Sequence, residues 1–237
     1  ADAYIVCVPT PFADGYKVDK RFIYSAAEAM APYLRPGALV VLESTSPPGT
    51  TRDLAEYIVA LRPDLTLDDD ADNAIFVAHC PERVLPGQIM EEMESNDRVV
   101  GGLTPRGTEK ATSLYRLFCT AELLQTDATT AEMAKLTENS FRDVNIAFAN
   151  ELSLISDKLG IDVWELIELA NHHPRVNILQ PGPGVGGHCI AVDPWFIVSS
   201  APEEAKIIEL ARKVNNGKPD WVIGKVEAAL SLSLIHI

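Results

Sequence analysis

Residues 38–51 have the sequence ALVVLESTSPPGTT, in which five apolar residues are followed by a polar turn. An apolar run of this length is typical of a buried strand, and the Pro-Pro-Gly segment after it ends the strand. The pattern of residues 50–61 then predicts an amphipathic helix. Hydroxyls and a glycine meet the N-terminus of this helix, an arrangement suited to phosphate or ribose oxygens.

The same alternation of strand and helix extends to both sides, from residue 3 to about residue 125. Further strands are expected at 4–8, 75–79, 98–101 and 122–125, and further helices at 21–33 and 105–117. This order predicts an α/β fold with a parallel sheet and crossover helices.

Polar segments follow three of these strands, beginning at Val8, Glu43 and His79. In open parallel sheets ligands bind beyond the carboxyl ends of the strands. We therefore interpret the three strand ends as the outline of a cofactor cleft, although Ser, Thr and Pro are also common in ordinary loops.

A single long helix is predicted over 129–160, where apolar residues recur every three or four positions. Thr129 and Glu132 have the spacing of a capping box at its start. Lys135 and Asn139 are four residues apart and share one face of this helix, beside the apolar stripe. A solvated lysine is the ordinary alternative for such a position.

Further helices are expected at 163–170 and 203–214. The sequence NNGKP at 215–219 is expected to interrupt the second of these before a last helical piece, because Gly and Pro disfavour helix interiors.

Residues 182–196, GPGVGGHCIAVDPWF, contain four glycines and two prolines and predict a tight loop. Glycine lets a backbone approach a ligand closely, so Cys189 at the end of the glycines is a candidate nucleophile. The alternatives are a buried structural cysteine and a metal ligand. A closed zinc site needs four Cys or His ligands, and the sequence contains no Cys-x-x-Cys pair, so no metal is expected.

The charge of the chain excludes several classes of partner. It contains 34 acidic and 20 basic residues in 237, a net charge of -14, so binding to nucleic acid or to an anionic membrane surface is not expected. No apolar run reaches the roughly 20 residues of a membrane span. The four cysteines suggest no disulfide framework, which suits a reducing cytoplasm.

Several of these motifs, in this order, strongly resemble the nucleotide-sugar 6-dehydrogenases, the UDP-glucose/GDP-mannose dehydrogenase family, over residues 1 to about 230. The motifs are VPTP at 8–11, ST at 44–45 with PGTT at 48–51, PE at 81–82, Lys135 with Asn139, and GGHC at 186–189 with Asp193. Within the family, residues 171–180 and 189–196 look most like the branch that acts on UDP-N-acetyl-D-mannosamine.

The resemblance implies an NAD-dependent, four-electron oxidation of sugar C6 to a carboxylate, for surface polysaccharide such as enterobacterial common antigen. Cys189 would hold the sugar as a thiohemiacetal and then a thioester. Glu82 would position or activate the hydrolytic water, and Lys135 would stabilise the oxyanion. Asn139 and Asp193 would complete the polar network.

The resemblance also implies the binding residues and the assembly. Thr10, Ser44 and Thr45 would line the NAD site. The UDP-amino-sugar substrate would contact Arg83, Arg175, Asn177, Gly186 and Gly187. Arg175 would reach the substrate across the interface of a homodimer built largely by the long helix.

The resemblance divides the chain into four parts. Residues 1–126 would be the second part of a Rossmann-type NAD-binding domain and 127–214 an all-helical central domain. Residues 215–231 would begin a UDP-sugar-binding domain, and 232–237 look like a non-native scar. No Gly-x-Gly-x-x-Gly loop follows an early strand, so we expect a fragment that is inactive and marginally folded alone.

Two alternatives remain open at this point. A sister enzyme could act on UDP-N-acetylglucosamine, UDP-glucose or GDP-mannose. A non-catalytic nucleotide-sugar-binding module could keep the same fold, although the presence of Cys189, Lys135 and Glu82 argues against it, because a module that only binds needs no nucleophile.

Overall fold

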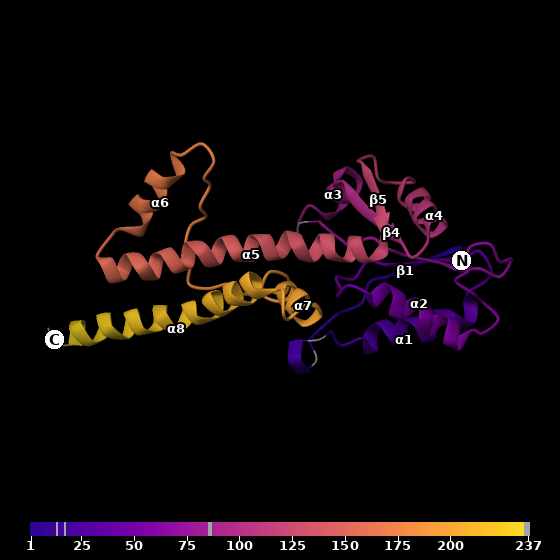
Figure 1. Ribbon diagram of the computed structural model, residues 1–237, viewed down its shortest axis with the longest axis horizontal. Helices are drawn as coiled ribbons and strands as arrows, with labels where there is room; N and C mark the ends of the chain where they lie inside the picture. The colour runs from indigo at the N-terminus through magenta and orange to yellow at the C-terminus, as the bar shows by residue number, and fades with distance from the viewer. Residues whose placement is uncertain (13, 17, 85–86, 235–237) are drawn as a thin grey trace. The chain divides into compact units, whose positions relative to one another are not determined.

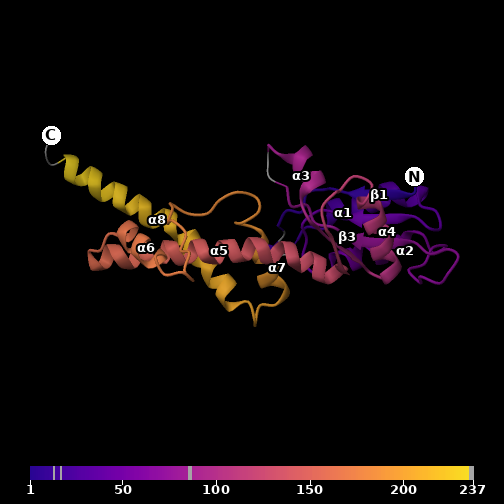
Figure 2. The same ribbon diagram turned by 90° about the horizontal axis from the view of Figure 1, so that it is seen from above.

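The computed structural model describes residues 1–12, 14–16, 18–84 and 87–234, and the chain forms two compact units, Ala1–Leu136 and Thr137–Ile237. Figures 1 and 2 show a sheet with helices in the first unit and helices joined by loops in the second. The predicted fold class, a Rossmann-type α/β part followed by an all-helical part, is confirmed.

The first unit is built on a five-stranded sheet whose order in space follows the order in sequence. Its strands are β1 (Ala3–Val6), β2 (Leu39–Leu42), β3 (Phe76–His79), β4 (Arg98–Gly102) and β5 (Leu123–Asp127). β1, β2 and β3 are parallel, and all residues of β2 and β3 are buried. Strands covered on both faces must be apolar throughout, which is why these two lack the usual alternation with polar residues.

The prediction of a wholly parallel sheet is wrong at one junction. β4 runs antiparallel to β3, with His79 opposite Gly101, and β5 is parallel to β4. A parallel connection needs a crossover helix that packs on the sheet. The only helix between β3 and β4 that the described residues form is α3 (Ile89–Ser95), which buries none of its residues, so the chain returns along the same edge.

Helices cover both faces of this sheet. α1 (Arg21–Met30), which continues as a 3-10 turn to Tyr33, and α2 (Thr50–Leu61) pack on Val40 and Leu42, whereas α4 (Pro105–Tyr115) packs on Leu39 and Val41. Because successive strand residues point to opposite faces, β2 contributes to both cores. Thr104 caps α4 by accepting a hydrogen bond from the Gly107 amide.

His79 gives the first unit a pH dependence. Its ring is fully buried, and neither ring nitrogen has a hydrogen-bond partner among the described residues. Burial lowers the pKa of His79 from 6.5 to about 3. The unfolded chain therefore binds a proton below pH 6.5 that the folded chain does not, and stability falls as the pH drops from 6.5 toward 3.

We expect this contribution of His79 to lower the free energy of unfolding by about 1.4 kcal/mol for each pH unit below the ordinary histidine pKa. His79→Leu, which has a similar volume and no titrating group, should remove it. The measurement is the urea midpoint at about pH 7 and about pH 5 for both proteins. An equal fall in the two proteins would show that His79 does not titrate as described.

The second unit contains most of α5 (Ala128–Leu159), together with α6 (Val163–Asn171), α7 (Asp193–Ser200) and α8 (Lys206–Leu234). The long helix and the helix near 163–170 are thereby confirmed, whereas α7 was not anticipated. No helix among the described residues combines the length and the apolar character needed to cross a membrane.

The predicted capping box at the start of α5 is wrong. Asp127 caps the helix instead, because its Oδ1 accepts a hydrogen bond of 2.9 Å from the Thr130 amide and its Oδ2 accepts one from the Thr130 hydroxyl. Glu132, expected to close the box, points to another helix altogether.

The predicted interruption at 215–219 is also wrong, because α8 continues through Pro219. Buried side chains on α8 hold this segment against α5. Asn215 Nδ2 donates to Asp143 Oδ1 at 2.8 Å, and Asn215 Oδ1 accepts from Asn150 Nδ2 at 2.8 Å. Lys218 contacts Ser153 through its ammonium group. These tertiary contacts outweigh the helix-breaking tendency of Gly217 and Pro219.

A buried ion pair completes this contact between α5 and α8. Arg212 Nη1 lies 2.7 Å from Asp143 Oδ1, and the two side chains are 2% and 0% exposed. Arg212 also donates to Asn216 through Nη2. Asn150 in turn accepts from the Gly182 amide at 2.9 Å through Oδ1, so the same network fixes the start of the cysteine loop.

Candidate active site

The carboxyl ends of β1 and β2 bring the three predicted cofactor-binding residues together. The Val8 amide donates to Ser44 Oγ at 2.8 Å, and Thr10 Oγ1 donates to the Thr45 carbonyl at 2.8 Å. The register of the sheet explains this meeting, since Val6 pairs with Leu42 and the chains leave the two strands side by side.

The chemistry of this strand edge fits part of a dinucleotide site. Thr45 is partly exposed, and its hydroxyl has no hydrogen-bond partner among the described residues. The hydroxyls of Thr10 and Ser44 form the hydrogen bonds that join the two loops. The backbone of these loops lies beside the Thr45 hydroxyl. A free hydroxyl at the carboxyl edge of parallel strands suits the ribose and amide groups of NAD.

One sequence-based interpretation of this edge is corrected. The N-terminus of α2 was expected to receive phosphate or ribose oxygens, but the carboxylate of Glu132 occupies it. Glu132 accepts from the Gly49 amide at 2.6 Å, the Thr51 amide at 2.7 Å and the Thr51 hydroxyl at 2.6 Å. The amides that would bind an external anion are therefore already paired with an internal one.

Glu132 is 1% exposed, so its loss should be costly. We expect Glu132→Ala to lower the free energy of unfolding by about 3 kcal/mol, because buried amides of Gly49 and Thr51 lose their acceptor. Glu132→Gln should cost less, since the amide oxygen replaces one acceptor while its NH₂ group opposes another donor. Urea denaturation measures both values, and an Ala variant as stable as the parent would contradict this assignment.

Glu82 follows β3 and is held from two sides. Its Oε1 accepts from the amides of Arg83 and Val84, at 2.6 and 2.9 Å. Its Oε2 lies 3.4 Å from Arg98 Nη2. The side chain of Glu82 stays 37% exposed, so water reaches the carboxylate. Sequence reasoning missed Arg98, although a charged residue directly before the apolar pair Val99 and Val100 was a usable signal.

The environments of the four cysteines differ. Cys7 donates to Glu43 at 3.2 Å, and burial together with Glu43 raises the pKa of its thiol to about 12. Burial raises the pKa of Cys80 to about 11. Cys119 is buried, whereas Cys189 lies exposed in the glycine-rich loop; Cys7 is also exposed, but its thiol has the raised pKa. A thiol whose pKa is raised this far is a poor nucleophile, so Cys189 is the best candidate of the four.

The loop that carries Cys189 is tied to the start of α7. The Cys189 carbonyl accepts from the Val192 amide at 3.0 Å and the Asp193 amide at 2.8 Å. Gly187 has a φ of +90°, a conformation that other residues rarely adopt. A Cβ on Gly184 would lie 2.9 Å from the Pro219 ring of α8. These glycines are therefore required by the path of the loop.

The second unit joins two of the predicted catalytic residues directly. Asn139 Nδ2 donates to Asp193 Oδ2 at 2.6 Å, and Asp193 is 3% exposed at the first position of α7. This bond links α5 to the helix that begins four residues after Cys189. Asn139 and Asp193 are therefore in direct contact, and their part in a catalytic network stays a prediction.

The remaining predicted residues lie at the following places. Lys135 is partly buried on α5, and its side chain makes no hydrogen bond or ion pair to another described residue. Arg83 donates to the Asp97 carbonyl at 2.9 Å. Arg175 and Asn177 are exposed in the segment after α6, and Gly186 is exposed in the cysteine loop. Asn171 closes the segment after α6 through two hydrogen bonds to the Ile178 backbone.

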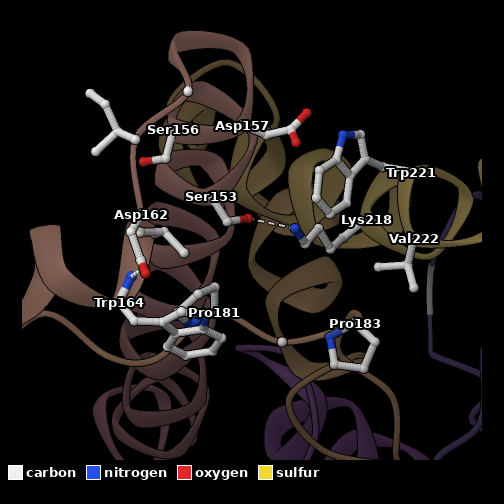
Figure 3. Close-up of a pocket in the computed structure, with 14 residues that line it drawn as sticks. Ser153, Ser156, Asp157, Asp162, Trp164, Pro181, Pro183, Lys218, Trp221 and Val222 are labelled. Atoms are coloured by element: carbon white, nitrogen blue, oxygen red, sulfur yellow. Dashed lines mark hydrogen bonds between the residues drawn. The ribbon is translucent and has the colours of Figure 1, made fainter. Parts of the chain in front are cut away.

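A pocket of about 820 Å³ lies elsewhere in the second unit, between α5, the start of α6 and α8. Figure 3 shows Lys218 pointing to Ser153 beside the ring of Trp221, with Trp164 near Pro181. None of the residues predicted for the site lines this pocket. Among the described residues, no group of three or more His, Cys, Asp or Glu side chains is arranged to hold a metal ion.

Comparison with known proteins agrees with this arrangement. The chain is 60% identical over 233 residues to UDP-N-acetyl-D-mannosamine dehydrogenase of Yersinia pestis, covering 98% of the chain and 56% of the relative. It is 59% identical over 231 residues to NDP-N-acetyl-D-galactosaminuronic acid dehydrogenase of Ralstonia nicotianae, covering 97% and 55%. The chain thus spans about half the length of these curated relatives.

A solved structure of a UDP-D-ManNAc dehydrogenase from Pyrococcus horikoshii superimposes with a TM-score of 0.89 at 43% identity, over 98% of this chain and 54% of that one. Residues 1–119 match the NAD binding domain of the UDP-glucose/GDP-mannose dehydrogenase family, and residues 129–217 match its central domain. The chain belongs to the UDP-glucose/GDP-mannose dehydrogenase family.

Proposed function

We propose that the chain is part of an NAD-dependent dehydrogenase that oxidises C6 of UDP-N-acetyl-D-mannosamine to give UDP-N-acetyl-D-mannosaminuronate. One observation carries the catalytic part of this proposal: Cys189, an exposed free cysteine in the glycine-rich loop, lies four residues before Asp193, which Asn139 holds at 2.6 Å. The names of the relatives at about 60% identity support the substrate.

The proposed chemistry needs a group that retains the substrate between two oxidations. NAD, when bound, accepts a hydride in each of them. The Cys189 thiolate adds to the aldehyde carbon, which forms a C–S bond and turns the carbonyl oxygen into an oxyanion. The second oxidation converts this thiohemiacetal into a thioester.

Two side chains then act on the oxyanion and on the water that hydrolyses the thioester. The Lys135 ammonium would stabilise the oxyanion, because it makes no hydrogen bond or ion pair to another described residue that would compete. Water attacks the thioester carbon, its proton passes to Glu82, and the C–S bond breaks to release the carboxylate and the Cys189 thiolate. Asn139 and Asp193 would keep the start of α7 in place below this thiol.

The nucleotide sugar that is oxidised has a second candidate. The Ralstonia relative, named for an N-acetyl-D-galactosaminuronic acid, has almost the same identity as the Yersinia one, so an N-acetyl-D-galactosamine nucleotide is the second candidate. The direction of one hydroxyl or acetamido group separates such sugars, and no residue described here reports it. UDP-N-acetylglucosamine, UDP-glucose and GDP-mannose are weaker candidates.

The test is NADH formation by the full-length gene product with each of these nucleotide sugars. Turnover on UDP-N-acetyl-D-mannosamine, with two NADH formed per sugar consumed, is the expected result. Turnover on another sugar would remove the named substrate and keep the mechanism. NAD binding without turnover on any sugar would favour a non-catalytic module.

We also propose that the protein forms a homodimer through α5. Phe141, Phe148 and Ile155 recur every seven residues on this helix and are 71%, 53% and 45% exposed. Two helical turns take about seven residues, so the three side chains form one apolar stripe that a second copy could cover. Light scattering of the full-length protein should give the mass of two chains; a monomer would contradict the proposal.

The product's use and location follow from the same proposal. A uronic acid of an amino sugar would serve surface polysaccharide such as enterobacterial common antigen, and synthesis from a nucleotide sugar would take place in the cytoplasm. The absence of disulfides among the four described cysteines is compatible with this compartment. Loss of the polysaccharide on gene deletion is the expected outcome, and its persistence would count against the pathway.

A further inference from the structure

Arg98 is a buried cation at the start of β4, and its side chain is 4% exposed. Its guanidinium lies 5.2 Å from the centre of the Tyr115 ring and 5.8 Å from that of Phe118. Nη1 is 4.0 Å from Cys80 Sγ, and Nη2 is 3.4 Å from Glu82 Oε2. Two aromatic faces thus fix the orientation of a group whose nearest carboxylate, in the described part of the chain, is Glu82.

The two oxygens of Glu82 are held differently. Oε1 accepts two backbone hydrogen bonds, from Arg83 and Val84, which anchor the carboxylate to its own turn. Arg98 faces Oε2 from the buried side. Backbone amides bind one oxygen of this carboxylate and a rigid guanidinium binds the other, so the carboxylate cannot rotate freely. Its exposed edge remains accessible to water.

We propose that Arg98 is a positioning residue for thioester hydrolysis, acting only through Glu82. This inference rests on the proposed function and extends it to a residue with no role in the two oxidations. Water attacks the thioester, Glu82 takes its proton, and the Cys189 thiolate leaves. Arg98 keeps the Glu82 carboxylate oriented for that single step, so its loss slows hydrolysis while both oxidations proceed.

The test separates the oxidations from hydrolysis in the full-length protein. Arg98→Met keeps the length and apolar packing of the side chain and removes its charge. Rapid mixing with NAD and substrate should give a burst of two NADH per site, followed by steady turnover reduced at least about 30-fold, which is less than the roughly 10²-fold or more that acid–base catalysis itself contributes. Intact-protein mass spectrometry should then find the sugar acyl group on Cys189.

Three further variants make the outcome decisive. Arg98→Lys retains a charge but not the planar fork, and should recover part of the turnover. Glu82→Gln should reproduce the burst and the trapped acyl group. Arg52→Met replaces an exposed arginine on α2 whose side chain makes no hydrogen bond or ion pair with another described residue, and it should behave as the parent. If Arg98→Met does not fold, Arg98→Lys carries the same comparison of burst with turnover.

The failures are distinguishable. If Arg98→Met and Arg98→Lys lose burst and turnover in equal proportion, Arg98 has only a structural role and the inference is overturned. If Glu82→Gln shows the burst and trapped acyl group but the Arg98 variants do not, the inference fails and the proposed function stands. If the parent forms NADH without any acyl group on Cys189 in any variant, the proposed thioester chemistry itself fails.

Discussion

Cys189→Ala will abolish steady NADH formation by the full-length protein, with a loss of at least about 10³-fold, since removing an enzyme nucleophile can cost about 10⁶-fold. The reason is specific to the proposed chemistry. Without the thiol no C–S bond holds the aldehyde, and the second oxidation loses the sulfur-bound carbon on which it acts. Initial-rate measurements at saturating NAD and substrate give the loss directly.

The matched controls are the other cysteines. Cys119→Ala, at a buried thiol in the first unit, should retain turnover, and the affinity of the Cys189→Ala protein for NAD should be unchanged. Turnover of Cys189→Ala within tenfold of the parent would end the proposal of a covalent intermediate at this residue. Loss of NAD binding would instead show that the substitution damaged the fold.

Asp143→Ala should produce the largest loss of stability, about 3–5 kcal/mol, because it leaves the charge of Arg212 buried without a carboxylate partner. Among the described residues, the Arg212 side chain then keeps a hydrogen bond only to Asn216, and Asn215 loses an acceptor at 2.8 Å. Urea denaturation followed by circular dichroism measures the change in midpoint and slope.

A second ion pair between the same two helices is the control. Lys225 Nζ lies 2.6 Å from Asp157 Oδ1, but these side chains are 49% and 41% exposed. Asp157→Ala should cost less than about 1 kcal/mol, since solvent screens the pair. Replacing Asp143 by Leu together with Arg212 by Met should recover most of the stability, because no charge is then left unpaired. Equal costs at the buried and exposed pairs would contradict this account.

Much of the fold could be predicted because the patterns that produce it are local. The five strands and helices α1, α2, α4, α5 and α6 follow from runs of apolar residues with period two or about four. The direction of β4 could not be read in this way. Whether a connection crosses the sheet depends on where α3 packs, and that is a property of tertiary structure.

The unbroken α8 is a second feature that depends on tertiary structure and not on a local sequence pattern. Gly217 and Pro219 weaken a helix locally, and a sequence pattern reports only that weakness. The opposing contacts come from Asp143 and Asn150, more than 60 positions earlier in the chain. Likewise Glu132 has a capping box's spacing, but its partners lie at 49 and 51.

The candidate site was predictable to the extent that its residues lie in recognisable motifs. Asn139 and Asp193 were both named from such motifs, and the structure places them in direct contact. The contacts made by Arg98, Glu132 and Asn171 were not predicted, because each of these side chains holds a segment that no local pattern links to it.

The continuity of α8 has a consequence for the chemical ageing of the protein. Asn216 and Gly217 form the dipeptide most prone to deamidation, a reaction in which the glycine nitrogen attacks the asparagine side chain. In a helix ψ is held near about −42°, which keeps the Gly217 nitrogen out of line for attack on the Asn216 side chain. Arg212 also binds the Asn216 oxygen. The helix thus protects Asn216 and Gly217 from deamidation, although the composition of this segment predicted that the helix would end there.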